Sequence, residues 1–314
     1  MSLYKAFWIQ ASESERARRL LSETFTGPKS RFIAGDTLDE GVGRVRALNR
    51  TPVNGRTVNI GAVLDYVGEG VHDMEGALRA RDTYLNILDE IHGERLNSTI
   101  AIKLTQLGLL VGLDECLENV ASIFGHARKY GIWPEIDAEQ DKYAQDTLQV
   151  HHELRLAGVD NVVIALQSYR RAAEKEAREL REKGAAVRIV KGAYKEPLQV
   201  AYQRKSEVDA GYVHLMEILM DGARVNGTRL VLGTHDESMI ERAEREIERD
   251  HRLDDKTEFA MLLGVRNSRL GQLAYDGRRT SVYVPYGPEW FPYFCRRLGE
   301  RPANLAFVAR NLLS

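Results

Sequence analysis

The stretch NVVIALQSYRRAAEKEARELREKGAAVRIVKGAY, residues 161–194, decides the fold of this chain. It begins with the apolar run 161–167, continues through the charged segment 174–184, and closes on a second apolar run, 185–194. Short runs rich in valine and isoleucine are typical of buried strands, and the charged segment between them is typical of a surface helix. The stretch therefore predicts a strand–helix–strand unit with two parallel strands.

The same alternation extends from residue 58 to the end of the chain. Eight strand-like runs occur, at residues 58–67, 99–105, 132–137, 161–167, 185–194, 228–236, 258–265 and 280–287. Helical patterns separate these runs, and a further helical pattern follows the last of them. Eight strand–helix units in roughly 250 residues match a closed (β/α)8 barrel of the TIM type. A doubly wound open sheet is the main alternative. Eight repeats without a visible second domain favour the barrel.

The first 50 residues differ from the rest, because they are highly charged and have helical patterns without a strand-like run. Gly35-Asp36-Thr37 is a capping sequence for a helix that ends near Arg50. We therefore expect an N-terminal helical arm, residues 1–50, and a catalytic barrel domain, residues 51–314. The arm would lie outside the barrel or across one of its ends.

Composition restricts the class of protein. The formal net charge of −2 gives no reason to expect binding to nucleic acid. The two cysteines, Cys116 and Cys295, lie far apart and lack metal-ligand spacing, which fits a reducing compartment. No run reaches the ~18–20 apolar residues that span a bilayer, and the N-terminus lacks the apolar core of a signal peptide. We expect a soluble cytoplasmic protein whose contact with membranes is at most peripheral and transient.

Polar residues stand repeatedly at the ends of the predicted strands, where barrel enzymes carry their chemistry. They are Asp65, Lys103, Asp137, Gln167, Arg188, Lys191, Thr234, His235, Asp236 and Tyr283. For Asp65 and Asp236, capping of the next helix or contact with water explains the residue equally well. Lys103 and Arg188 need another explanation, because a cation inside an apolar strand costs several kcal/mol unless it is paired.

The last predicted strand leads into a helix, residues 289–299, that carries the adjacent pair Arg296 and Arg297. In isolation the pair is a solvated helix end that Glu300 can neutralise. At the mouth of a barrel the pair is a candidate binding site for a carboxylate, since guanidinium groups form bidentate hydrogen bonds with carboxylates. Together with Lys103, Arg188 and Lys191 against Asp137, it predicts a net positive mouth that binds an anionic ligand or cofactor.

Other chemistries fit less well. His151 and His152 fall in a helical segment, where we expect them at the surface, and no paired-histidine strand motif of a barrel metallohydrolase is present. No serine nucleophile elbow and no phosphate-binding P-loop occurs. Two alternatives stay open: a lyase that forms a Schiff base on Lys103 or Lys191, and a barrel that only binds a small anionic amino acid.

Six motifs in order on successive strands resemble the proline dehydrogenase family, most closely its short monofunctional bacterial members. They are IAIKLT (100–105), IDAEQ (136–140), ALQSY (165–169), RIVKGAY (188–194), GTHD (233–236) and YVPYGPEWFPYFCRRLGER (283–301). The resemblance runs from about residue 31 to the C-terminus. It implies an FAD-dependent (β/α)8 barrel that oxidises L-proline to Δ1-pyrroline-5-carboxylate by hydride transfer from proline C5 to flavin N5. A membrane quinone would accept the electrons, and a separate pyrroline-5-carboxylate dehydrogenase would process the product.

The resemblance also implies roles for individual residues. Arg188 would lie beside flavin N5 and Asp137 would pair with Lys103 under the substrate; these two, Asp137 and Arg188, are the catalytic candidates. The cofactor would contact Ala138, Gln167, Arg188, Lys191, Gly192, Ala193, Thr234, His235 and Glu300. Proline would contact Lys103, Tyr194, Leu262, Tyr283, Arg296 and Arg297. Glu69 resembles a gate that pairs with Arg296 when the site closes. The group that takes the amine proton is not implied.

Overall fold

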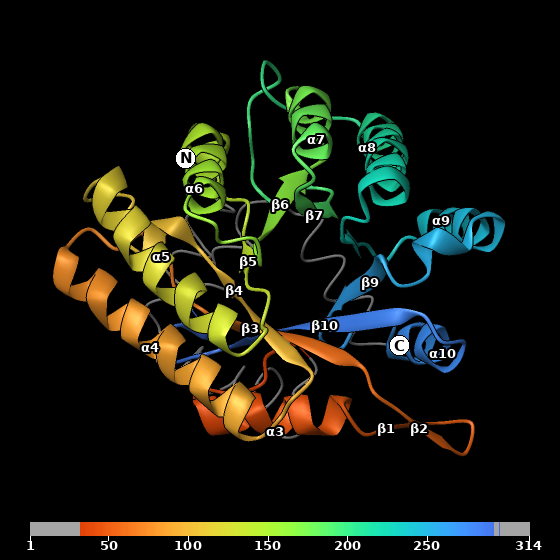
Figure 1. Ribbon diagram of the computed structural model, residues 1–314, viewed down its shortest axis with the longest axis horizontal. Coiled ribbons are helices and arrows are strands. Elements are labelled where there is room, and N and C mark those ends of the chain that lie inside the picture. The colour runs from red at the N-terminus through yellow and green to blue at the C-terminus, as the bar shows by residue number, and fades with distance from the viewer. Residues whose placement is uncertain (1–31, 292–294, 296–314) are drawn as a thin grey trace.

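A closed barrel of eight parallel strands forms the centre of the computed structural model, which describes residues 32–291 and Cys295 (Figure 1). The strands follow the order β10-β3-β4-β5-β6-β7-β8-β9, and β10 pairs with both β9 and β3, so no edge remains. They are β3 (Gly61–Tyr66), β4 (Ser98–Ile102), β5 (Glu135–Ile136), β6 (Val163–Gln167), β7 (Ala186–Val190), β8 (Leu230–Gly233), β9 (Thr257–Leu262) and β10 (Arg279–Tyr286). The predicted barrel is confirmed and the open sheet is excluded.

Helices surround the barrel, and one follows each of the strands β3 to β9 (Figure 1). They are α4 (Met74–Gly93), α5 (Leu113–Lys129), α6 (Ala144–Leu156), α7 (Ala173–Glu182), α8 (Lys205–Asn226), α9 (Glu237–Arg249) and α10 (Asn267–Tyr275). Short 3-10 turns occupy Leu104–Gln106, Asp141–Tyr143 and His251–Leu253. In α9 the apolar face of Ile240, Ala243 and Ile247 is buried, as the helical period requires. None of the described helices is long and apolar enough to cross a membrane.

The one described helix before the barrel, α3 (Leu38–Leu48), packs on the outside of β3 and β10. Thr37 caps it: its hydroxyl accepts from the Glu40 N–H, and the Glu40 carboxylate accepts from the Thr37 N–H at 3.0 Å. A Cβ at Gly41 would lie 3.1 Å from the ring of Tyr286, so glycine allows this close approach. The predicted capping sequence is therefore confirmed for α3, whereas residues 1–31 lie outside the described part.

An unpredicted hairpin separates α3 from the barrel. Strands β1 (Thr51–Val53) and β2 (Arg56–Val58) pair in antiparallel fashion and lie apart from the barrel (Figure 1). Asn54 and Gly55 connect them, both with positive φ (48° and 78°), as a two-residue turn requires. The first barrel strand consequently begins at Gly61 rather than at residue 58.

The core has two parts. A large apolar cluster fills the space between strands and helices, whereas a small separate cluster is made of Val163, Ala186, Val231 and Ala260. Ala186 lies two residues before Arg188 on β7, so both side chains lie on the same face of that strand. The small size of this second cluster leaves room for the charged side chains described below.

One expectation about the helices is wrong. His151 is buried in α6, with 2% of its surface exposed, whereas its neighbour His152 is exposed as expected. Burial, with Arg155 and Lys183 nearby, lowers the pKa of His151 to about 3, so this side chain is neutral at neutral pH. Cys116 and Cys295 are both buried.

Candidate active site

A cavity of about 640 Å³ opens at the carboxyl ends of the barrel strands. This volume lies within the range of small-molecule and cofactor sites. Every described residue of the predicted site except Glu69 lines it: Lys103, Asp137, Ala138, Gln167, Arg188, Lys191, Gly192, Ala193, Tyr194, Thr234, His235, Leu262 and Tyr283. Arg296, Arg297 and Glu300 lie outside the described residues. The fold thus brings the motifs of six strands together at one opening.

Lys103 lies at the floor of this cavity between two carboxylates. Its Nζ is 2.5 Å from Asp65 Oδ1 and 3.2 Å from Asp137 Oδ2. Lys103 is 3% exposed and Asp65 is fully buried, so the ion pairs are shielded from water. The predicted pair of Lys103 with Asp137 is present in the structure. Asp65, which helix capping or water could have explained from the sequence, is a second partner of the same lysine.

Arg188 projects from β7 and bridges two carboxylates, Glu135 on β5 and Asp137 just after that strand. Its Nη2 donates to Asp137 Oδ1, and its Nε lies 2.9 Å from Glu135 Oε2. Glu135 and Asp137 are two residues apart on an extended segment, which places both side chains on the same face. The guanidinium also lies over the Tyr283 ring, 5.2 Å from its centroid. Arg188 is 8% exposed, so these contacts fix its direction.

Asp137 is held as an anion. Burial would raise its pKa, but Lys103, Arg188 and the Tyr283 hydroxyl, which donates to Oδ2 at 2.6 Å, together lower the pKa below its usual range. Both carboxylate oxygens accept hydrogen bonds. A carboxylate with a depressed pKa is a poor proton acceptor at neutral pH. The geometry therefore makes Asp137 an orienting anion more than a general base.

Burial acts differently on the neighbouring acids. It raises the pKa of Asp65 even though Lys103 opposes the shift, and it raises the pKa of Glu135 against the opposing charge of Arg188. Desolvation also raises the pKa of the Tyr283 hydroxyl well above its ordinary value, and the charge of Asp137 adds to the effect. Tyr283 thus stays protonated and remains a donor to Asp137.

Lys191 lies at the rim of the cavity in a network with α8 and α9. Its Nζ is 2.6 Å from Asp209 Oδ1 and 3.1 Å from Asp236 Oδ2, and Lys205 pairs with the same two carboxylates. Asp236 also caps α9 through the Ser238 N–H. Asp236 therefore caps α9 and also lines the cavity.

Each described cation of the mouth is paired with carboxylates. Lys103, Arg188 and Lys191 face five of them, Asp65, Asp137, Glu135, Asp209 and Asp236, and Lys205 shares the last two. Because Arg296 and Arg297 lie outside the described residues, the net positive charge of the mouth stays a prediction.

The far wall of the cavity is built from β6, β8 and β9. Gln167 donates to the Glu139 carbonyl at 2.8 Å, and His235 Nε2 accepts from the Leu262 N–H at 2.9 Å. Burial, with Arg266 and Lys191 nearby, lowers the pKa of His235 to about 4. The imidazole is therefore neutral, and its proton lies on Nδ1 because Nε2 accepts.

Sequence reasoning missed Glu139, which joins the loops after β4 and β5. Its carboxylate accepts from the Thr105 N–H at 3.0 Å and from the Thr105 hydroxyl at 2.5 Å. The same hydroxyl accepts from the Gly70 N–H at 3.2 Å, next to Glu69. Glu69 does not line the cavity, but its loop is thereby anchored at the same end of the barrel.

Among the residues that the structure describes, no group of acids, histidines or cysteines is placed to hold a metal ion.

A family model described as proline dehydrogenase matches residues 50–310, most of the chain. The chain belongs to the proline dehydrogenase family. Proline dehydrogenase 1 of Bacillus subtilis (strain 168) is 32% identical over 284 residues, which are 90% of this chain and 90% of that protein. The proline dehydrogenase of Deinococcus radiodurans is 31% identical over 318 residues and covers 99% of this chain. The family resemblance of the strand-end motifs is thus confirmed.

Solved structures agree on the fold. Proline utilization A from Bdellovibrio bacteriovorus superposes with a TM-score of 0.74 at 19% identity over 85% of this chain. A variant of proline utilization A from Bradyrhizobium japonicum gives a TM-score of 0.74 at 21% identity over 94%. This member of the proline dehydrogenase family spans 32% of the length of each of those chains, so the likeness concerns their barrel portion.

Proposed function

We propose that this chain oxidises L-proline to Δ1-pyrroline-5-carboxylate with bound FAD, by hydride transfer from proline C5 to flavin N5, and that a quinone reoxidises the flavin. The observation that carries the proposal is the cavity at the strand ends, with the Arg188–Asp137–Lys103 network as its floor. Membership of the proline dehydrogenase family supports the same chemistry. Residues 51–314 would be the catalytic domain and residues 1–50 the helical arm.

The lining of the cavity fits a large flat cofactor. Small residues leave its walls smooth: Ala138, Ala165, Gly192, Ala193, Gly233 and Ala260. Gly192 has φ 114°, and a Cβ there would lie 2.3 Å from the Tyr169 ring. A Cβ at Gly233 would lie 2.9 Å from the Ile189 carbonyl oxygen. Only glycine permits the backbone to follow this path at these two positions. The volume of the cavity agrees with a dinucleotide-sized ligand that is partly open to solvent.

The polar groups of the lining have the donors that such a cofactor needs. Bound FAD would supply the hydride acceptor. Arg188, Gln167 and Lys191 would hold its ring system, and Thr234 and His235 would hold its more distant part. The contribution of Arg188 is a fixed cation, since Glu135 and Asp137 set the direction of its guanidinium.

Proline would lie between the ionic floor and aromatic walls. Tyr194, Leu262 and Tyr283 line the cavity and would enclose the ring, above Lys103 and Asp137. In this proposal Arg296 and Arg297 bind the carboxylate, Glu300 supports the cofactor side, and Glu69 closes on Arg296. Because Asp137 is held ionised by three partners, its role would be to orient Arg188 and Tyr283, and the amine proton would leave to another group or to water.

The proposed partners follow from the chemistry of the product and the electrons. A separate pyrroline-5-carboxylate dehydrogenase would consume the product. A membrane quinone would take the electrons through a transient peripheral contact.

The absorption spectrum of the purified protein tests the proposal against its alternatives. We expect flavin bands, or their appearance when FAD is added to protein purified without it. A protein that gives no flavin bands even after addition of FAD would exclude a flavoenzyme. Trapping of a borohydride-reduced adduct on Lys103 or Lys191 would instead support a Schiff-base lyase.

A further inference from the structure

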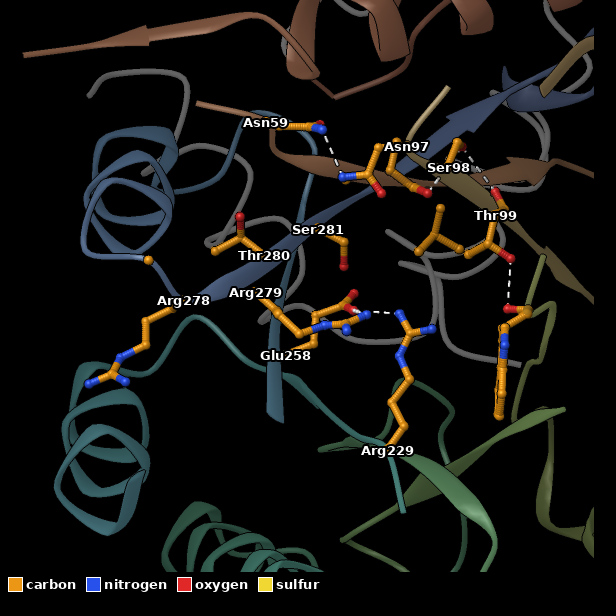
Figure 2. Close-up of a pocket in the computed structure, with 15 residues that line it drawn as sticks. Asn59, Asn97, Ser98, Thr99, Arg229, Glu258, Arg278, Arg279, Thr280 and Ser281 are labelled. Carbon is orange, nitrogen blue, oxygen red and sulfur yellow. Dashed lines mark hydrogen bonds and ion pairs between the residues drawn. The ribbon is translucent and has the colours of Figure 1, made fainter. Parts of the chain in front are cut away.

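A second pocket, of about 370 Å³, lies at the amino ends of the barrel strands, and Figure 2 shows the residues that line it. The first residues of β3, β4 and β10, namely Gly61, Ser98 and Arg279, line it. The cavity proposed as the active site is lined by residues at the carboxyl ends of the strands. The two openings therefore face opposite directions, and the second is not part of the proposed reaction.

Positive charge exceeds negative charge in this second pocket. Of the described residues that line it, three are arginines, and Glu258 supplies the carboxylate. Arg229 Nη2 lies 2.5 Å from Glu258 Oε2, and Arg279 Nη2 lies 3.7 Å from the same oxygen. Burial would raise the pKa of Glu258, but Arg229, the Ser281 hydroxyl and Arg279 together lower it, so Glu258 is ionised. Two guanidinium groups thus share the Glu258 carboxylate, and the buried Glu135 adds a further negative charge near Arg229. Arg279 has no closer carboxylate than Glu258 among the described residues, so its positive charge is the less compensated of the two.

The third arginine does not share in this cluster. Arg278 Nη1 lies 2.7 Å from Asp254 Oδ1, and its side chain points away from Glu258 and Arg229 (Figure 2). Arg278 and Arg279 are adjacent in the chain and carry the same charge, but only Arg279 faces Glu258. The chain therefore offers a matched pair of positions, one in the cluster and one outside it.

Buried donors beside the cluster lack partners. Arg229 Nε and the Thr280 hydroxyl are buried, and neither has a hydrogen-bond partner among the described residues. Thr280 is 6% exposed. Buried polar groups are almost always satisfied by protein, water or a ligand. Water would satisfy these two donors but would leave the positive charge in place, whereas an oxyanion would meet both needs.

The opposite wall is polar and uncharged. Asn59, Asn97, Ser98 and Thr99 line it, and the Asn97 amide donates to Asn59 Oδ1 at 3.0 Å (Figure 2). The volume exceeds that of a single ion and falls at the lower end of small-molecule sites. The ligand would thus be a small organic anion, or a phosphate with its water, oriented with its charge toward Arg279.

We propose that this pocket at the amino ends of the strands binds a small oxyanion, a carboxylate or a phosphate, between Arg229 and Arg279. The anion would accept two hydrogen bonds from the Arg279 guanidinium (bidentate binding) and one each from Arg229 Nε and the Thr280 hydroxyl. Glu258 would stay paired with Arg229 and keep that guanidinium in place.

Calorimetric titration of the full-length protein with inorganic phosphate, and separately with succinate, tests this site at constant ionic strength. We expect saturable binding of at least one of them, and the two arms tell phosphate from carboxylate recognition. Arg279→Gln should raise the Kd at least about tenfold, since a charge-assisted pair of hydrogen bonds is lost. Arg279→Lys keeps the charge without the two-pronged geometry and should give an intermediate Kd.

Arg278→Gln is the control, because it removes the same charge from the next position and should change the Kd by less than about twofold. Proline turnover should be unaffected by Arg279→Gln, which shows that the variant is folded. The proposal is overturned if neither anion binds saturably, or if the two glutamine variants weaken binding equally. Binding that Arg279→Gln leaves unchanged would also overturn it, because the anion would then occupy another site.

Discussion

At the scale of single residues, two buried cations organise the proposed active site. Lys103 and Arg188 stood out in the sequence because a cation inside an apolar strand must be paired, and the structure gives each of them two carboxylates. Their partners were harder to foresee. Asp65 and Glu135 are opposite these cations only because β3 neighbours β4 and because a single strand, β6, separates β5 from β7 around the barrel. The two-residue spacing of Glu135 and Asp137 was a usable signal.

The buried Lys103–Asp65 pair should be strongly coupled. Lys103→Met should lower the free energy of unfolding by about 3–5 kcal/mol, because it leaves Asp65 buried without a cation. Asp65→Asn in addition should recover part of that loss. Urea unfolding of the two single variants and the double variant measures the coupling. If the three changes in free energy are simply additive, the two side chains do not stabilise each other.

The loss of unfolding free energy caused by Lys103→Met should grow as the pH rises. Burial raises the pKa of Asp65, and loss of Lys103 would raise that pKa further. A carboxyl group whose folded pKa is raised takes up a proton on folding, so its contribution to stability falls as the pH rises. The destabilisation by Lys103→Met should therefore be smaller at pH 5 than at pH 8.

The proposed gate can be tested at Glu69. Glu69→Ala should raise KM for proline and slow the steps linked to closure, because closure would lose an ion pair with Arg296. Steady-state and stopped-flow flavin reduction measure the two effects. Glu75→Ala is the control, since Glu75 is exposed on α4 and pairs with Arg79. Kinetics of Glu69→Ala identical to those of the control variant would remove the gate.

At the scale of elements, the strands and helices of the barrel followed from their apolar periods, but two local features did not. The hairpin β1–β2 was missed although Asn54-Gly55 is the typical sequence of a two-residue turn. The burial of His151 was missed because a helix period places a residue on a face but does not say what covers that face. The first miss concerns a local sequence pattern, and the second concerns packing between segments that are distant in the sequence.

The cap of α3 is a measurable local contribution. Thr37→Ala should lower the free energy of unfolding by about 1 kcal/mol, because the Glu40 N–H loses its acceptor. Thr37→Ser, which keeps the hydroxyl, should be close to the parent. Urea unfolding distinguishes them. Equal stability of the alanine and serine variants would mean that the cap contributes nothing.

The buried, neutral His151 in α6 should make the free energy of unfolding depend on pH. Unfolded histidine titrates near ~6.5, whereas the pKa of folded His151 is about 3, so only the unfolded chain gains this proton between these values. Stability should therefore fall as the pH drops from 6.5, by up to ~1.4 kcal/mol per pH unit from this residue. Unfolding free energies at pH 7, 6 and 5 should show a shallower slope for His151→Gln and an unchanged slope for the exposed control His152→Gln. Identical slopes in all three proteins would contradict the assignment.

At the scale of the whole molecule, eight repeats of one unit made the barrel predictable, and the rule that barrel sites lie at strand ends made most of the cavity predictable. The ion-pair partners of the site were not predictable, because pairs such as Lys191 with Asp209 join distant segments. The same limit hid the pocket at the other end, where Arg229, Glu258 and Arg279 come from three strand starts or the residues before them.

Anaerobic addition of L-proline to the purified protein is the most direct test of the proposed chemistry. We expect L-proline to bleach the absorption band of the bound flavin, because hydride transfer reduces it, and a quinone to restore the band. D-proline should leave it unchanged, since the walls and the proposed carboxylate clamp present one face of the ring to the cofactor. A flavin band that L-proline does not bleach, or that both enantiomers bleach equally, would contradict the assignment of this cavity to stereospecific proline oxidation.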